Sequence, residues 1–290
     1  MRTITIDQDR CVLCEACVDI CVRSIYEATD DGIIANDPSR CIFCGHCVAI
    51  CPEDVIQLPV VNMEEFEPAP EKDMLPPADQ LMALFRSRRS IRRYLNHPVE
   101  REKIEMIIEA GRFAPTGGNL QPFRFSVVQN PESLKSIKHL MGEMLVRQAG
   151  QTDKMLEEKI RQGKPLTPAE QIQQNYAGSM QAMVDSTRSG VDKMLWGAPA
   201  MISVYTNPGV GDSGVNAGLA GMQMSLMAEA LGLGNCFIGF VVGAANAVPE
   251  IKNIMKIPVD STVFLSLIVG YSDLEFHKVV SRKPARISWA

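Results

Sequence analysis

The sequence predicts an α+β protein in which a small cysteine-rich module, residues 1–58, precedes a larger domain, residues 81–290. Three observations predict this organisation. Eight of the nine cysteines lie within the first 51 residues, and a proline-rich stretch at 59–80 separates them from the rest of the chain. Beyond residue 80, segments with helical periodicity are interleaved with short apolar runs that are typical of strands. This pattern favours one α+β domain with a core shared across a homodimer.

The cysteines of the module form two runs with identical spacing, C-x2-C-x2-C-x3-C, and the second run is followed by Pro52. This spacing resembles that of bacterial ferredoxins, in which thiolates hold two [4Fe–4S] clusters and the fourth cysteine of each run binds the other cluster. Val22 stands where the first run would have its proline. The resemblance implies two ligand sets, Cys11, Cys14, Cys17 and Cys51 for one cluster and Cys41, Cys44, Cys47 and Cys21 for the other.

Two other uses of clustered cysteines fit the pattern less well. A disulfide framework needs an oxidising compartment, and residues 1–10 lack the apolar stretch of a signal peptide, so we expect a cytoplasmic protein. A structural zinc site needs four ligands in a closed tetrahedron, and a third cysteine two residues after a C-x2-C pair is unusual there. The iron–sulfur interpretation is therefore favoured.

The negative charge is concentrated in the module. Residues 1–58 contain ten acidic and four basic side chains, a local charge of −6, whereas the remaining 24 acids and 25 bases give +1. An acidic electron-transfer module favours docking onto a basic redox protein and argues against nucleic acid, although acidity for solubility explains the charge equally well. Residues 230–249 are uncharged but contain four glycines and two asparagines, so no membrane span is expected.

Each cysteine run is followed by a short apolar element, Ile25-Tyr26 and Val55-Ile56. Residues 1–58 thus repeat one unit of about 30 residues, which is too small to be stable by burial alone and needs its clusters. The five prolines of 59–80 predict a semi-stiff acidic linker.

The larger domain begins with helical patterns. Residues 81–89 form an amphipathic turn, and 99–114 place Ile104, Ile107 and Ile108 on one face with Gly111 as the C-cap. Further helices are predicted in 132–195, with a polar break at 162–171. The helix predicted at 215–234 is so rich in Gly, Ala and Met that it should be almost wholly buried. Apolar strands are predicted at 123–130, 199–207, 236–243 and 262–272.

Four segments of this domain carry candidate binding groups. They are the basic run 88–94, the turn 114–123, the glycine-rich segment 231–240 and the basic pair at 282–283. Arginine forks bind oxyanions, and small residues let the backbone approach a planar ligand. Taken singly, each segment has a plainer explanation: a solvated helix end, an ordinary turn, or, for Cys236, a packed thiol and not a nucleophile.

Together the four segments resemble the FMN-dependent nitroreductase family over residues 81–290, because RRSIR, APTGGNLQP, GLGNCFIG and a terminal SRKP occur in that order. The resemblance implies a homodimer with FMN at the subunit interface. Phe123 stands where the family often has tryptophan, and Ile238 replaces an acidic residue found in many members. The implied FMN-binding set is Arg88, Arg89, Ser90, Arg92, Pro115, Thr116, Asn119, Gln121, Ile238, Gly239, Arg282 and Lys283.

A competing motif, Gly209-x-Gly211-x-x-Gly214, follows a predicted strand and precedes a helix. A dinucleotide-binding site would need an acidic residue at the end of a following strand, whereas Glu229 lies inside the same helix. We interpret the motif as a loop.

The sequence thus predicts an iron–sulfur flavoprotein oxidoreductase that passes electrons from two clusters to FMN and on to a small acceptor such as a nitroaromatic or a quinone. An ene-reductase, a dehalogenase, a flavin reductase and a non-catalytic electron carrier for a protein partner stay open. The donor is also open between NAD(P)H and a redox protein, and no catalytic side chain is predicted.

Overall fold

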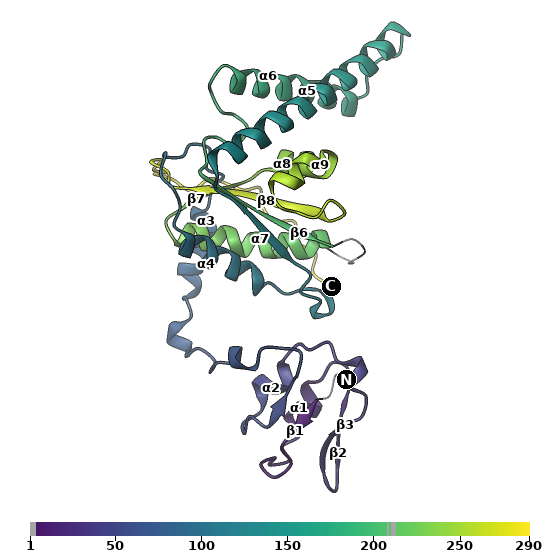
Figure 1. Cartoon of the computed structure of the whole chain (residues 1–290), viewed down its shortest axis with the longest axis vertical. Helices are drawn as coiled ribbons and strands as arrows, with labels where there is room; N and C mark the ends of the chain where they lie inside the picture. Colours follow the sequence, from purple (N-terminus) through teal and green to yellow (C-terminus); the bar gives the residue numbers. More distant parts are fainter. Residues whose placement is uncertain (1–3, 208, 210–212) are drawn as a thin grey trace. The chain divides into compact units, whose positions relative to one another are not determined.

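The structure is a computed structural model that describes residues 4–207, 209 and 213–290. Contacts divide the chain into two compact units, each described here by itself (Figure 1). The N-terminal unit contains Met1–Pro77 together with Thr116–Gln121, and the C-terminal unit contains Ala78–Pro115 and Pro122–Ala290.

The N-terminal unit consists of two small antiparallel sheets and two one-turn helices. Strand β1 (Thr5–Ile6) pairs with β4 (Ile56–Gln57), and β2 (Tyr26–Thr29) pairs with β3 (Gly32–Ala35). The helices are α1 (Ala16–Ile20) and α2 (His46–Ile50). A 3₁₀ turn at Pro38–Arg40 lies between them, and further 3₁₀ turns lie at Met63–Glu65, Lys72–Met74 and Gly117–Asn119. The core contains Ile25, Ile33, Ile56 and Leu58, so both predicted apolar elements are buried.

The backbone of this unit repeats with a period of 30 residues. Left-handed φ angles occur at Leu13 and Phe43, at Glu15 and Gly45, and at Ser24 and Asp54. Each short helix begins one residue after the second member of this series. The predicted internal repeat is therefore present in the conformation as well as in the sequence.

The C-terminal unit is built on a four-stranded antiparallel sheet with the order β5-β6-β8-β7. The strands are β5 (Arg124–Val128), β6 (Ala200–Thr206), β7 (Gly234–Phe237) and β8 (Thr262–Gly270). The central strands β6 and β8 are apolar on both faces because helices cover both sides of the sheet. The predicted strands at 123–130, 199–207 and 262–272 are present.

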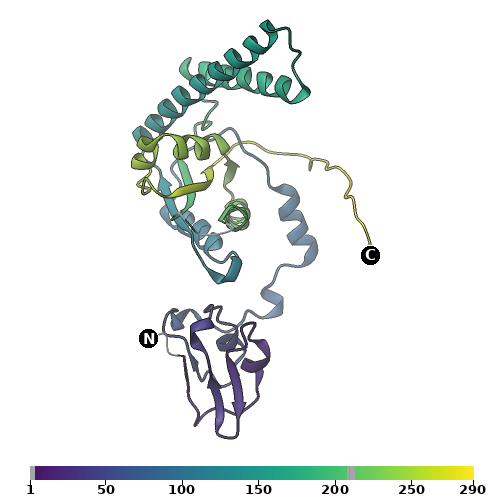
Figure 2. The same cartoon turned by 90° about the vertical axis from the view of Figure 1, so that its right-hand side faces the viewer.

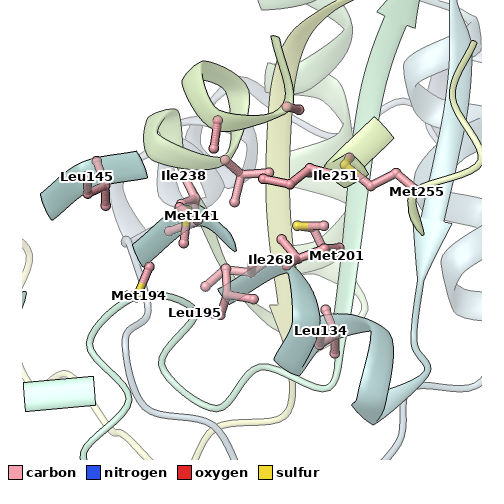
Figure 3. Packing of buried hydrophobic residues seen from close by; sticks show 14 of the residues in the cluster. Leu134, Met141, Leu145, Met194, Leu195, Met201, Ile238, Ile251, Met255 and Ile268 are labelled. Carbon is pink, nitrogen blue, oxygen red and sulfur yellow. The ribbon is translucent and has the colours of Figure 1, made fainter. Parts of the chain in front are cut away.

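Alternate residues of the central strands belong to two separate cores. Ile202, Val204 and Leu267 pack with α4 (Arg101–Arg112) and α7 (Ser213–Ala230). Met201 and Ile268 face the other side, where α5 (Pro131–Arg161), α8 (Gly239–Ala247) and α9 (Pro249–Ile254) pack. Figure 3 shows this second core, in which Met141 of α5 lies beside Ile238.

The prediction that Gly111 caps a helix is wrong. Helix α4 continues through Gly111 to Arg112, and Phe113 is the C-cap. A Cβ atom at Gly111 would lie 2.8 Å from Cγ of Met224, so the glycine allows the close packing of α4 on α7. The predicted apolar face is correct in that Ile104 and Ile107 are buried.

Two further expectations are corrected. The predicted strand at 236–243 ends at Phe237, and α8 begins at Gly239. Helix α7 is not wholly buried, because Val215, Leu219 and Met222 are 69%, 44% and 39% exposed. The spacing of these three residues places them on one side of the helix, so α7 presents an apolar stripe.

The remaining helices agree with the sequence pattern. Helix α3 (Ala78–Ser87) begins three residues before the predicted amphipathic turn at 81–89. Helices α5 and α6 (Pro168–Arg188) are separated at the predicted polar break, and Thr167 with Glu170 forms a capping box that starts α6. Among the described residues, no helix combines the length and apolar character needed to cross a membrane.

Candidate cluster and cofactor sites

The eight clustered cysteines line two cavities of the N-terminal unit, and the grouping crosses between the two runs. One cavity is lined by Cys11, Cys14, Cys17 and Cys51, and the other by Cys21, Cys41, Cys44 and Cys47. Each encloses about 360 Å³, including solvent-filled space at its mouth. Three neighbours in one run and the last cysteine of the other run therefore face the same space, as the ferredoxin spacing implies.

The thiols surround a volume and do not converge on a point. All nine cysteines are free, and no three His, Cys, Asp or Glu residues among those described are arranged to hold a single metal ion. Four thiolates bound to one zinc at 2.3 Å would lie about 3.8 Å apart at the corners of a tetrahedron. A cavity lined by four thiols is suited to a polynuclear cluster.

Two hydrogen bonds reach the sulfur atoms of the second cavity. The Tyr26 hydroxyl donates to Sγ of Cys47 at 3.1 Å, and the backbone N–H of Phe43 donates to Sγ of Cys41 at 3.3 Å. Burial raises the pKa of the Cys17 and Cys47 thiols. Such donors also help to set the potential of a cluster.

In the C-terminal unit, the basic segment that follows α3 is held against β7. Ser90 forms a parallel bridge to Asn235, and the N–H of Ile91 donates to the Asn235 carbonyl at 2.9 Å. Asn235 is itself fixed in the core, because its Oδ1 accepts a hydrogen bond from the Ser225 hydroxyl at 2.6 Å. The backbone from Arg88 to Arg92 is thus anchored in a defined position.

The side chains of this segment have different surroundings. Nη1 of Arg88 and Nε of Arg89 are buried without a hydrogen-bond partner among the described residues. Arg93 pairs with Asp273 at 2.7 Å, and Arg92 lies over the Trp196 ring at 5.9 Å. Arg89 lines a hollow of about 540 Å³ beside Gly232–Gly234 and Ser272. The orphaned Nε of Arg89 therefore belongs to a side chain that lines this hollow, and a guanidinium donor of this kind is suited to an oxyanion.

The turn that follows α4 is divided between the two units, since Pro115 belongs to the C-terminal unit and Thr116–Gln121 to the N-terminal unit. Within it, Thr116 Oγ1 accepts from the Gln121 N–H at 3.0 Å, and Asn119 Oδ1 accepts from Gln121 Nε2 at 3.1 Å. The Asn119 amide donates to the carbonyls of Ile42 and Phe43 at 3.1 and 2.9 Å. The predicted residues of this turn are therefore brought together, with Asn119 held by the cysteine loop.

Ile238 and Gly239 lie where β7 passes into α8. The Ile238 side chain is buried in the core (Figure 3), so only its backbone can face a ligand. Gly239 and Phe240 line a hollow of about 1180 Å³, solvent included, together with residues of α5 and α6. Tyr176 stacks on Phe240 with ring centroids 6.0 Å apart. Tyr176 was not predicted as a site residue, because the helices within 132–195 carry no recognisable motif.

The C-terminal basic pair is not brought to the other candidates. Residues 271–290 contain neither helix nor strand, and Arg282 and Lys283 are exposed on this extended tail (Figure 2). Nη1 of Arg282 donates to the adjacent Ser281 carbonyl at 3.1 Å. Among the described residues, no hydrogen bond or ion pair joins the pair to Arg88 or Arg89. Cys236 is 1% exposed and packs in the core.

The competing glycine motif falls partly outside the described residues, which omit Val210, Gly211 and Asp212. Ser213 opens α7, and Glu229 lies within that same helix. The acidic strand end that a dinucleotide site needs is not provided by Glu229.

Comparison with family models decides the family. Residues 85–271 match the model of the nitroreductase family. The chain belongs to this family. Residues 3–52 of the same chain match a 4Fe-4S dicluster domain, which therefore precedes the nitroreductase domain.

Two of the proteins similar in sequence to this chain are iodotyrosine deiodinases. The chain is 27% identical over 207 residues to iodotyrosine deiodinase of Drosophila melanogaster, covering 67% of this chain and 63% of the relative. It is 35% identical over 74 residues to iodotyrosine deiodinase 1 of Sus scrofa, covering 26% of each chain. The matches span less than two thirds of these relatives.

Solved structures share the fold of this chain. A nitroreductase with bound FMN from Bacteroides fragilis aligns with a TM-score of 0.52 at 20% identity, over 72% of this chain and 98% of its own. A second, from Desulfitobacterium hafniense and also with bound FMN, has a TM-score of 0.51 at 21% identity, over 71% and 97%. The predicted nitroreductase-like α+β fold is confirmed.

Proposed function

We propose that the chain is an iron–sulfur flavoprotein oxidoreductase that holds two [4Fe–4S] clusters and FMN and reduces a small organic acceptor, such as a nitroaromatic or a quinone. The observation that carries the proposal is the presence of a 4Fe-4S dicluster domain and a nitroreductase domain in one chain. When bound, the clusters supply single electrons and the flavin supplies an electron pair to the acceptor. We place the cluster module at 1–58, the linker at 59–80 and the flavin domain at 81–290.

The side chains present are suited to the anionic phosphate of FMN. The orphaned Nη1 of Arg88 and Nε of Arg89 are donors without an acceptor, and a ribityl phosphate would satisfy them. Two of the structures with this fold contain bound FMN. The remaining proposed contacts are Ser90, Arg92, Pro115, Thr116, Asn119, Gln121, Ile238 and Gly239, with Arg282 and Lys283 from the tail.

The hollow at Gly239 suits a flat and largely apolar acceptor. Phe240 and Tyr176 offer aromatic faces, Met144 and Met155 offer adaptable apolar contacts, and Gln173 supplies a polar anchor. These side chains would orient the acceptor and exclude water from it. We assign no proton transfer to any of them.

A second candidate function is the reductive removal of halogen from an aromatic acceptor. The similarity to iodotyrosine deiodinases favours it. The fold and the proposed cofactors would be the same, so only the acceptor separates the two candidates.

We also propose a homodimer. The apolar stripe of Val215, Leu219 and Met222 on α7 is exposed in the single chain, although the sequence pattern is that of a buried helix. A second copy packed on this stripe would bury it, as the shared core predicted from the sequence requires.

The electron donor is proposed to be a redox protein that docks on the acidic module, with NAD(P)H as the alternative. Residues 1–58 carry a local charge of −6, from ten acids and four bases, which suits a basic partner. The nine free thiols are compatible with the reducing cytoplasm, where we place the protein.

The test begins with anaerobic purification and analysis of iron, sulfide and flavin. We expect about eight iron atoms and about one FMN per chain. Turnover is then followed with dithionite or a reduced ferredoxin as donor and with a nitroaromatic, a quinone and a halophenol as acceptors. A protein without iron or flavin, or one that transfers electrons to none of these acceptors, would refute the proposal.

The arginine assignment is tested with a matched pair of variants. Arg89→Gln should weaken FMN binding about 10- to 150-fold, the equivalent of one charge-assisted hydrogen bond. Arg93→Gln, which breaks only the surface pair with Asp273, should leave the Kd for FMN unchanged. Equal effects of the two substitutions would remove Arg89 from the site.

A further inference from the structure

The two halves of the N-terminal unit differ at one chemically important position. The 30-residue period that relates Cys17 to Cys47 also relates Tyr26 to Ile56. Both side chains are buried, at 5% and 1% exposure, and both line a cysteine cavity. Tyr26 carries a hydroxyl donor, whereas Ile56 has none, so the two cavities cannot receive the same hydrogen bonds.

The Tyr26 hydroxyl is directed at a ligand atom. It donates to Sγ of Cys47 at 3.1 Å, within a core that contains Ile25, Val48 and Leu58. In the other cavity the equivalent place is taken by the aliphatic side chain of Ile56, beside Ile33 and Val55. A donor in an apolar setting interacts strongly with a sulfur atom that gains negative charge.

We propose that the Tyr26 hydroxyl raises the reduction potential of the cluster held by Cys21, Cys41, Cys44 and Cys47, and so makes the two clusters inequivalent. A hydrogen bond to a ligand sulfur stabilises the more negative, reduced cluster. Burial of Cys47 has the opposite effect, because desolvation disfavours added negative charge, and the hydroxyl offsets it. Tyr26 thus acts through its hydrogen bond to Cys47, and it determines which of the two clusters is reduced first.

The same cluster loop carries the contact with Asn119, whose amide donates to the carbonyls of Ile42 and Phe43. Asn119 belongs to the turn that we propose for FMN. The inference rests on the proposed loading of the unit with two clusters.

The test is a potentiometric titration of the anaerobic full-length holoprotein, followed by electron paramagnetic resonance. Tyr26→Phe should lower one of the two midpoint potentials and leave the other unchanged. At a fixed potential, the ratio of reduced to oxidised cluster should fall about two- to tenfold, the worth of one net hydrogen bond. Tyr205→Phe, which removes a hydroxyl in the other unit, should change neither potential.

Substitution of one cysteine ligand identifies the cluster that Tyr26→Phe affects. Cys44→Ser should perturb the same midpoint that Tyr26→Phe lowers, since Cys44 lines the Tyr26 cavity. If the two substitutions act on different midpoints, or if Tyr26→Phe moves neither or both equally, the proposal is overturned.

A second substitution, expected to raise the midpoint potential instead of lowering it, serves as the test if the Tyr26→Phe protein does not assemble its clusters. 3-Fluorotyrosine placed at Tyr26 keeps the hydroxyl and makes it a stronger donor, so the same midpoint should rise. No rise would refute the inference. Iron analysis separates this failure from failure of the proposed function, because a protein that lacks about eight iron atoms contradicts the cluster assignment itself.

Discussion

Replacing Gly234 by alanine tests whether the position of the basic segment depends on close packing against β7. A Cβ atom at Gly234 would lie 2.8, 2.9 and 3.0 Å from Cγ2, Cγ1 and Cβ of Ile91. The nearest contact falls 0.6 Å short of the 3.4 Å at which ordinary contacts begin. Ile91 is β-branched and 7% exposed, so it has little freedom to turn away. The segment that carries Arg88 and Arg89 must then move.

The expected cost is that of overpacking a core, about 1–3 kcal/mol. For a domain of this size it corresponds to a fall in Tm of about 2–12 °C. If the displacement takes one guanidinium donor away from the phosphate, the Kd for FMN should also rise about 10- to 150-fold.

The assays are urea or thermal unfolding of the anaerobic protein and flavin-fluorescence titration. Gly178→Ala is the matched control, because this exposed glycine lies inside α6 with no atom within 4 Å of an added Cβ. It should be neutral or stabilising by up to about 1 kcal/mol. Ile91→Ala in the Gly234→Ala background should couple favourably by about 0.5–3 kcal/mol. Wild-type stability and FMN affinity in Gly234→Ala, or additive behaviour of the pair, would refute the reasoning.

Three other predictions address the clusters, the dimer and the second core. Cys21→Ala should remove the cluster of the second run and reduce iron from about eight to about four atoms or fewer, whereas Cys236→Ala should leave iron unchanged; equal iron in the two variants would contradict the crossed grouping. Leu219→Lys places a charge in the apolar stripe of α7 and should convert a dimer into a monomer in sedimentation or light scattering, and an unchanged mass would place the interface elsewhere. Burial raises the pKa of Asp192, but hydrogen bonds from Lys138 and three backbone N–H groups outweigh it, so the pKa is lowered overall. Asp192→Asn should therefore lower the free energy of unfolding by about 1.5–3 kcal/mol at neutral pH. The difference between variant and wild type should disappear as the pH falls from about 4 through the lower folded-state pKa of Asp192. A difference in urea midpoint between the two proteins that is the same at pH 3 and pH 7 would contradict this.

The sequence predicted most of the cysteine chemistry because covalent spacing limits what the thiols can reach. The resemblance of this spacing to bacterial ferredoxins implied that Cys21 and Cys51 belong to opposite ligand sets, and the two residues line different cavities. Tertiary contacts decided what the sequence missed. Gly111 has the composition of a cap, but packing against Met224 requires a glycine inside α4. A short apolar run such as 236–243 is ambiguous between strand and helix, and the chain changes from one to the other at Gly239.

The candidate flavin site was predictable in its motifs and not in its contacts. RRSIR identified Arg88 and Arg89, but only the structure distinguishes their orphaned donors from Arg93, which is paired with Asp273. The partner of Asn119 could not be foreseen, because a hydrogen bond across 76 residues leaves no periodic trace in the sequence. Tyr176 was missed for the same reason, since it reaches Phe240 only through the packing of α6.

Because the fourth cysteine of each run lines the cavity of the other run, neither half of the N-terminal unit provides a complete set of cluster ligands. Each cavity takes one wall from the other repeat, and each repeat holds three left-handed residues in the same places. If oxygen destroys one cluster, its fourth cysteine is released, and the ligand loop of the other cluster that contains this cysteine becomes looser. The strained turns then lose the metal that stabilises them. Loss of one cluster to oxygen should consequently make the remaining cluster more sensitive to oxygen than it is in the intact protein.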